Sequence, residues 1–163
     1  MSIFTKSMKP VSGEVFEVWF NRQGFRNFSA REISCYWSRT KGGAKNAPPP
    51  KYLWHRFVPT LRVVDDLRDQ FGEPVTVSSN YRSPAYNTQC GSSNPADPRA
   101  LAGRGSQHVR FAAADIQVRG VSSTRVADYL LDERRRGAFV GGVGKYATFV
   151  HVDTRPYNAT WGF

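Results

Sequence analysis

Two stretches of this sequence decide how the chain is expected to fold: SQHVRFAAADI, residues 106–116, and FVHVD, residues 149–153. They hold two of the chain's three histidines and two carboxylates, in apolar surroundings where an unpaired polar group is costly to bury. A catalytic zinc takes three protein ligands from histidine, cysteine and carboxylate, and keeps one position for water. His108, Asp115 and His151 would supply that set, so these residues predict a metal site.

The same two stretches predict two neighbouring strands. Residues 112–116 are typical of the entry to a buried strand, which would hold Asp115 at a fixed point. In residues 149–153 apolar and polar residues alternate with period two, so His151 and Asp153 share one face of a strand. Two such strands side by side would bring the histidines and carboxylates together at a sheet.

Further blocks of the sequence extend this pattern. Ser106-x-His108 followed by Asp115, and then FVHVDTR at 149–155, resemble the D-Ala-D-Ala carboxypeptidase-type zinc peptidases. That family includes VanX-like dipeptidases and many phage endolysins. The resemblance also takes in VSSNYRSPAYN at 77–87 and GGVGKY at 141–146. Several separate blocks in the right order make the resemblance specific.

The resemblance implies roles for individual residues. It makes His108, Asp115 and His151 the zinc ligands, and it implies that Arg82 and Ser106 contact the substrate. From its chemistry alone, Arg82 is either half of a surface ion pair or a bidentate clamp for a carboxylate. Ser106 is either a turn residue or a hydrogen-bonding partner of the substrate.

The sequence departs from the family pattern at two positions. Phe111 stands where such proteins often carry glycine, so the loop between His108 and Asp115 must accommodate a large ring. Thr148 stands where many relatives place the Glu or Asp that acts as general base, and threonine cannot do that work. Asp153 is the candidate catalytic base in its place, and the alternatives are a partner of a ligand or a ligand itself.

Length and composition predict one globular domain, residues 1–163, in which residues 1–27 have no assigned role. Hydrophobic residues make up 40% of the chain, which argues against disorder. The formal net charge of +10 predicts attraction to polyanions, among them nucleic acid, lipopolysaccharide and anionic cell-wall polymers. Charge does not choose between them.

Few features point to other partners or compartments. Cys35 and Cys90 are expected to be buried or partly buried free thiols, with a single bridge between them as the alternative. The N-terminal residues have no long apolar core, so neither a signal peptide nor a membrane span is expected, and the protein is expected to be a monomer made in the host cytoplasm. His55 belongs to no pattern with metal-ligand spacing and is expected to be structural or exposed.

The remaining pattern predicts an α+β fold, with helices packed on a small, mostly antiparallel sheet that carries the zinc site. A capping box, Ser29 with Glu32, predicts a short helix, and apolar spacing predicts a longer one over 57–71. A third helix is predicted from Ser122 or Ser123 to the arginines at 134–136. The other expected segments are strands at 75–78, 140–146 and 149–154, an exposed loop at 38–51, and a mobile loop at 90–105 that forms one wall of a cleft.

Three functions follow as hypotheses. The resemblance implies a zinc metallopeptidase that cleaves peptidoglycan stem peptides as a D-Ala-D-Ala carboxypeptidase or an L-Ala-D-Glu endopeptidase, and a short basic chain of this kind resembles a phage endolysin. The second is a non-catalytic, zinc-stabilised binding module on the same scaffold, as in hedgehog signalling domains, and Thr148 supports it. Specific nucleic-acid binding is the weakest, because the chain has no recognisable readout motif.

Overall fold

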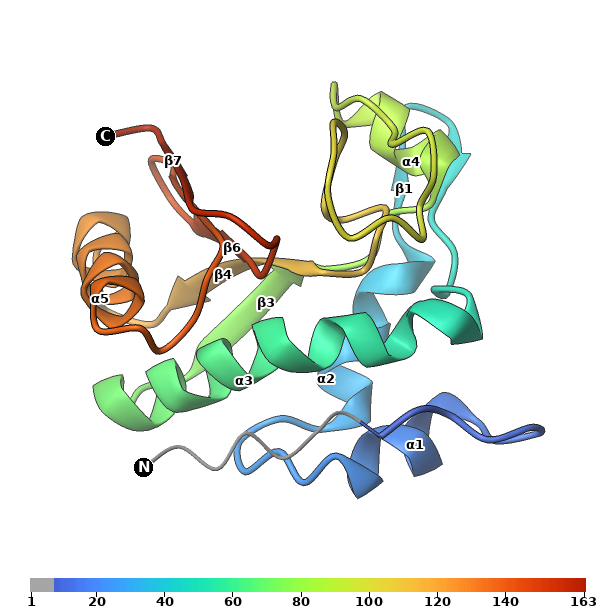
Figure 1. The fold of residues 1–163 in the computed structure, drawn as a ribbon, viewed down its shortest axis with the longest axis horizontal. Coiled ribbons are helices and arrows are strands. Elements are labelled where there is room, and N and C mark those ends of the chain that lie inside the picture. The colour runs from blue at the N-terminus through green and yellow to red at the C-terminus, as the bar shows by residue number, and fades with distance from the viewer. Residues whose placement is uncertain (1–7) are drawn as a thin grey trace.

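Alternating apolar residues build one five-stranded sheet in the order β3-β4-β6-β5-β7 (Figure 1). The computed structural model describes residues 8–163. Neighbouring strands pair antiparallel except β5 and β7, which are parallel. The predicted α+β class with a mostly antiparallel sheet is therefore confirmed. The strands are β3 Val75–Ser79, β4 Ala113–Val118, β5 Gly142–Lys145, β6 Val150–Asp153 and β7 Ala159–Trp161.

The central strands divide their side chains between a core face and a polar face. Ala114 and Ile116 of β4 lie in the hydrophobic core with Val150 and Val152 of β6. Because side chains alternate along a strand, the residues between them project to the opposite face. Asp115 and His151 are those residues, and Asp153 follows Val152 on the same face as His151. Strand periodicity therefore places the three side chains together.

Two helices cover the core face of the sheet. α3, Trp54–Phe71, buries Phe57, Leu61 and other apolar residues at helical spacing, and it ends at Gly72, whose φ of 63° lies in the left-handed region. It begins slightly earlier than the apolar pattern predicts. α5, Ser123–Arg135, starts where the Ser122 hydroxyl accepts a hydrogen bond from the Arg125 amide, as predicted.

Two short helices near the N-terminus pack beneath α3 (Figure 1). α1, Phe16–Arg22, buries Trp19 and Phe20 in the core. α2, Ala30–Ser34, has the predicted capping box, in which Ser29 and Glu32 each bind the other's backbone amide. A 3-10 helix, Cys35–Ser38, follows it. Residues 1–7 of the N-terminal segment lie outside the described residues.

Other short elements have little or no signal in the sequence. A hairpin of two short strands, β1 Thr40–Lys41 and β2 Ala44–Lys45, lies within the predicted exposed loop, and a 3-10 helix, Lys51–Leu53, begins at the last residue of that loop. α4, Pro84–Gln89, begins at the capping residue Ser83, and it was not predicted. β7 was not predicted either.

The buried side chain of Arg110 holds the loop over residues 91–105. Arg110 is only 2% exposed, and its guanidinium donates hydrogen bonds to the carbonyl oxygens of Ala102, Gly103 and Arg104. The buried cation thus ties down a segment whose composition alone predicts mobility. Among residues 8–163, no helix combines the length and hydrophobicity that crossing a membrane requires.

Candidate metal centre

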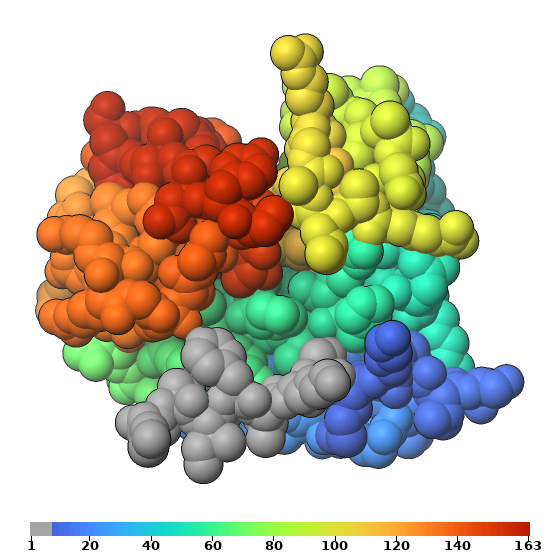
Figure 2. Space-filling model, viewed as in Figure 1, coloured from blue at the N-terminus to red at the C-terminus, as the bar shows by residue number. Residues whose placement is uncertain are grey.

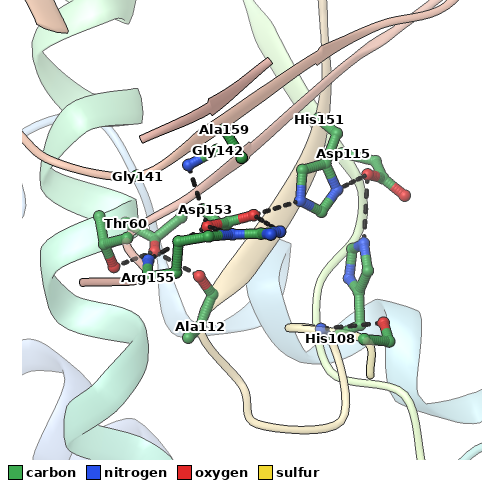
Figure 3. A network of polar contacts seen from close by, with 12 residues as sticks. Thr60, His108, Ala112, Asp115, Gly141, Gly142, His151, Asp153, Arg155 and Ala159 are labelled. Atoms are coloured by element: carbon green, nitrogen blue, oxygen red, sulfur yellow. Dashed lines mark hydrogen bonds and ion pairs between the residues drawn. The ribbon is translucent and has the colours of Figure 1, made fainter. Parts of the chain in front are cut away.

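Two histidines and an aspartate from three segments converge on one point (Figure 3). His108 Nε2 lies 3.2 Å from Asp115 Oδ1, and His151 Nδ1 lies 2.9 Å from the same oxygen. One potential ligand atom from each residue lies within 4.8 Å of those of the other two. All three residues are buried, with at most 7% of their surface exposed. The structure therefore brings together the three residues that the sequence predicts as metal ligands.

Sheet register explains why Asp115 and His151 meet. They are directly opposite each other in the antiparallel pair of β4 and β6, and side chains at such positions are neighbours. His108 comes from the turn that leads into β4, and Phe111 completes this turn with a φ of 52°. The side chain of Thr60 on α3 donates to the carbonyl of Ala112, 2.8 Å away, and so ties the start of β4 to that helix.

The ring of His108 is oriented by a backbone carbonyl. Its Nδ1 lies 2.6 Å from the carbonyl oxygen of Asn80, which is only an acceptor, so Nδ1 carries the proton and Nε2 is left as the lone-pair donor. Asn80 is itself fully buried, and its side chain is held by two hydrogen bonds. Its Oδ1 accepts from Trp37 Nε1, and its Nδ2 donates to the Ile33 carbonyl. These contacts fix which nitrogen of His108 faces Asp115.

The ring of His151 is oriented by Asp153. His151 Nε2 lies 2.9 Å from Asp153 Oδ2, so Nε2 donates and Nδ1 faces Asp115. Asp153 is 0% exposed and also accepts hydrogen bonds from the amides of Gly142 and Arg155. The Arg155 guanidinium binds both of its oxygens, at 2.8 and 2.6 Å. Such a carboxylate–histidine pair is the usual support of a metal-binding imidazole.

The charges at the site favour ionised carboxylates. Burial opposes ionisation of Asp115, but His108 and His151 outweigh it and hold the pKa of this carboxyl below its usual range. Burial likewise opposes ionisation of Asp153, and hydrogen bonds from His151 and Arg155 lower its pKa. Burial lowers the pKa of His108, whereas hydrogen bonds to both aspartates outweigh burial and raise the pKa of His151.

The donor set fits a divalent cation. With a proton on Nδ1, His151 is a cation that donates to Asp115, and a metal ion that replaced this proton would meet the same imidazole nitrogen and the same oxygen. His108 offers a second imidazole nitrogen, 3.2 Å from that oxygen. Two imidazoles and one carboxylate form a ligand set found in catalytic zinc sites.

A cavity of about 610 Å³ opens beside the three residues. In Figure 2 the loop before Ser106 and the C-terminal segment stand on either side of a notch. A larger cavity of about 780 Å³, between α3 and α5, contains none of the three. The side chains that line the smaller cavity with them include Lys41, Arg82, Cys90, Ser106, Tyr146, Phe149, Arg155 and Trp161.

The other predicted site residues lie at or behind this cavity. Arg82 lines it and donates from Nη2 to Asp115 Oδ2, 2.6 Å away, while Ser106 lines it and accepts from the His108 amide. Asp153 lies behind His151 and is not among the residues that line the cavity. Thr148 is exposed in the turn between β5 and β6 and does not line it either.

Several residues at the site have no predictive signal in the sequence. Lys41 and Trp161 come from strands of two and three residues, in which no local pattern marks them, and Asn80 lies within the block 77–87 of the resemblance but without a signal of its contact with His108. His55 lies outside the converging group. Cys35 and Cys90 are free thiols, as expected, and Cys90 is partly buried, but the expected burial of Cys35 is wrong because this residue is exposed. Tyr146 stacks on Phe149, with ring centroids 4.3 Å apart.

Comparison with known proteins places this geometry in a family. Residues 26–153, most of the chain, match the family described as Peptidase M15, whose members are metal-dependent. The matched segment includes His108, Asp115 and His151. No curated protein and no solved structure matches the chain. The resemblance seen in the sequence is confirmed, and the chain belongs to the peptidase M15 family of zinc peptidases, which includes VanX-like D-Ala-D-Ala dipeptidases and endolysin peptidases.

Proposed function

We propose that this protein is a zinc-dependent peptidase that cleaves the stem peptides of peptidoglycan. The observation that carries the proposal is the convergence of His108, Asp115 and His151 beside a cavity in an M15 chain. The bond cut is that of a D-Ala-D-Ala carboxypeptidase or an L-Ala-D-Glu endopeptidase. The proposal includes a role as a phage endolysin that acts, as a monomer, on the cell wall after its release.

In this proposal the three converging residues are the zinc ligands. His108 binds through Nε2, His151 through Nδ1 and Asp115 through Oδ1, because the other ring nitrogens are engaged by Asn80 and Asp153. When bound, zinc polarises a scissile carbonyl and lowers the pKa of a water molecule to about 7. The protein supplies the rest by orienting its ligands and holding the peptide.

Two further residues are proposed to hold the substrate. Arg82 is 14% exposed and uses Nε and Nη2 for Ser79 and Asp115, so its remaining Nη1 is available to a peptide oxygen in the cavity. Ser106 lines the same cavity next to His108. Both would keep the peptide in register with the metal ligands, which is where orientation contributes to rate.

Asp153 is proposed to act through His151. Its oxygens already accept five hydrogen bonds, and the residue is fully buried, so a positioning role is better supported than proton transfer to a reacting group. Its negative charge stabilises the Nε2 proton of His151 and thereby keeps Nδ1 turned toward Asp115. Proton transfer by Asp153 is the competing role, and the zinc affinity of an Asp153→Asn variant separates the two.

The positive charge of the protein supports action at a cell envelope. The net charge of +10 would raise the local concentration of the protein near anionic wall polymers. The cavity is also lined by three cationic side chains, those of Lys41, Arg82 and Arg155. Among residues 8–163, the carboxylate that lines it is that of Asp115. This balance favours substrates that carry carboxylates, as stem peptides do.

The decisive experiment is digestion of purified peptidoglycan followed by mass spectrometry of the muropeptides. The wild-type protein should contain one zinc per chain and release fragments that identify the bond, and a chelator should stop the release. His108→Ala and His151→Ala should each abolish it, whereas the matched control His55→Ala should not. Undiminished cleavage by both site variants would refute the metal-centre assignment.

A second candidate function is a non-catalytic, zinc-stabilised binding module. It is favoured by the exposed turn position of Thr148. It is also favoured by the lining of the cavity, in which the described residues, 8–163, contribute no carboxylate besides Asp115. A protein that binds one zinc per chain and retains peptidoglycan, yet releases no fragment in the digestion, would have this function.

A further inference from the structure

The C-terminal strand β7 builds one wall of the cavity beside the metal centre. The family match ends at residue 153, so β7 lies outside the matched segment. Its last residue, Trp161, is partly buried and lines the cavity together with Tyr146 and Arg155. The wall is therefore supplied by a part of the chain that the family match does not cover.

Trp161 packs directly against a proposed metal ligand. The centroids of the Trp161 and His151 rings are 5.1 Å apart, with an angle of 49° between the ring planes. Trp161 Nε1 donates to the Tyr146 hydroxyl, 3.0 Å away, and the Arg155 guanidinium lies 5.5 Å from the indole centroid. Three neighbours therefore fix the indole at the side of His151.

The strand that carries Trp161 is itself held in place. β7 pairs with β5 so that Trp161 lies opposite Gly144, and a Cβ at Gly144 would overlap the indole ring. From α5, Arg134 donates to the carbonyls of Gly141 and Ala159 at 2.8 and 2.7 Å, and to the Thr160 hydroxyl at 2.6 Å. The indole is thus a fixed part of the wall, because both its ring and its backbone are constrained.

We propose that Trp161 is a specificity-determining residue of the proposed peptidase. The inference rests on that function and assigns to the Trp161 indole the preference for alanine at the scissile bond that the proposed substrates imply. A group held at the metal ligands meets the Trp161 indole on the His151 side, and a long side chain there would have to displace a ring fixed by three neighbours. Pocket walls discriminate by size in this way, by roughly 10–200-fold per methylene.

The test compares stem peptides that carry Ala or Leu at the bond identified by the muropeptide digestion. Zinc-loaded wild-type protein should favour the Ala peptide, both in kcat/KM and in affinity measured by calorimetry. Trp161→Ala should raise the Leu-to-Ala ratio at least about tenfold, since it removes the obstructing ring. The matched control Phe163→Ala, which alters an aromatic residue of the same segment outside the cavity, should leave the ratio unchanged.

A second variant weakens the attachment of β7 through Arg134, a residue that does not line the cavity. Arg134→Gln removes the guanidinium that holds β7, so the Leu-to-Ala ratio should shift in the same direction while zinc content stays at one per chain. Arg134→Gln also provides the test if the Trp161→Ala variant does not fold. An unchanged ratio in folded, zinc-loaded Trp161→Ala or, failing that, Arg134→Gln overturns the inference and leaves the proposed function intact. Wild-type protein that neither binds nor cuts either peptide refutes both.

Discussion

Phe111 is the one non-glycine residue among residues 8–163 with a positive φ, at 52°. The left-handed conformation costs an ordinary residue roughly 1–2 kcal/mol. The ring offsets this strain because it is 0% exposed and stacks on Phe57, with centroids 4.5 Å apart and planes only 9° apart. Position 111, where the family resemblance leads us to expect glycine, thus keeps a glycine-like backbone and adds a core aromatic.

This strain predicts an unusual order of stabilities at position 111. Phe111→Gly and Phe111→Ala both remove the ring, but only glycine also relieves the strained backbone. Denaturant unfolding should therefore show the alanine variant to be less stable than the glycine variant by about 1 kcal/mol. The control is Phe57, in the interior of α3, where glycine should be worse than alanine by about 1 kcal/mol. The same order at both positions would contradict the strain argument.

Asp153→Asn tests how the buried carboxylate acts. Asparagine has the same size but no charge, so it supports the Nε2 proton of His151 less well and leaves Arg155 without its bidentate partner. We expect zinc affinity, measured by competition with a chelator, to fall roughly 10–100-fold while the fold is retained. The exposed carboxylate of Asp128 provides a control, because Asp128→Asn should leave the affinity unchanged. Unaltered affinity with lost turnover would instead show that Asp153 transfers the proton.

At the scale of elements, the close approach of β7 to β5 depends on Gly144. A Cβ at Gly144 would have three atoms of the Trp161 indole as its nearest neighbours. Gly144 also lies opposite His151 in the pairing of β5 and β6. The absence of a side chain at this position therefore lets the edge strand approach closely enough for Trp161 to reach the metal centre.

A double-mutant cycle should isolate this contact. Gly144→Ala alone should destabilise the protein by about 1–3 kcal/mol, because the new methyl group overlaps the indole. In a Trp161→Ala background the same change should cost less than about 0.5 kcal/mol, so the two sites are strongly coupled in denaturant unfolding. Equal costs in both backgrounds would mean that the methyl group disturbs the strands rather than the indole.

At the scale of the whole molecule, the candidate metal centre links segments that are far apart in the chain. His108 precedes β4, Asp115 lies on β4 and His151 lies on β6. A metal bound by all three would bind the folded protein and not the unfolded chain, so it should add to stability. This stabilisation should extend to the whole domain, because the sheet that carries Asp115 and His151 also packs against the hydrophobic core on its other face.

Removal of the metal should therefore lower the melting temperature. With free zinc at about 100 times the dissociation constant, binding adds about 2.7 kcal/mol, which for a domain of this size corresponds to roughly 5–10 °C. Chelation should remove this increment in a thermal melt, and added Zn²⁺ should restore it. His151→Ala should melt at the same temperature with and without chelator, whereas His55→Ala should respond as the wild type does. A chelator-independent wild-type melt would argue against a structural contribution from the metal.

Much of this architecture follows from local patterns. The period-two alternation at residues 149–153 places His151 and Asp153 on one face, and helical spacing identifies the core face of α3. The capping box at Ser29 marks the start of α2. These predictions succeed because backbone hydrogen bonding sets the periods of helices and strands, and the side-chain pattern must follow them.

The surroundings of the metal ligands come from long-range packing instead. Trp161 and Lys41 reach the site from strands of three and two residues, neither long enough to show a period, and Asn80 reaches it from the irregular position just after β3. The role of Asp153 likewise depends on Arg155 and on two backbone amides that fold around it. Residue types and spacing along the chain single out the candidate ligands, but which partners enclose them depends on how distant segments pack, and such contacts leave no periodic trace in the chain.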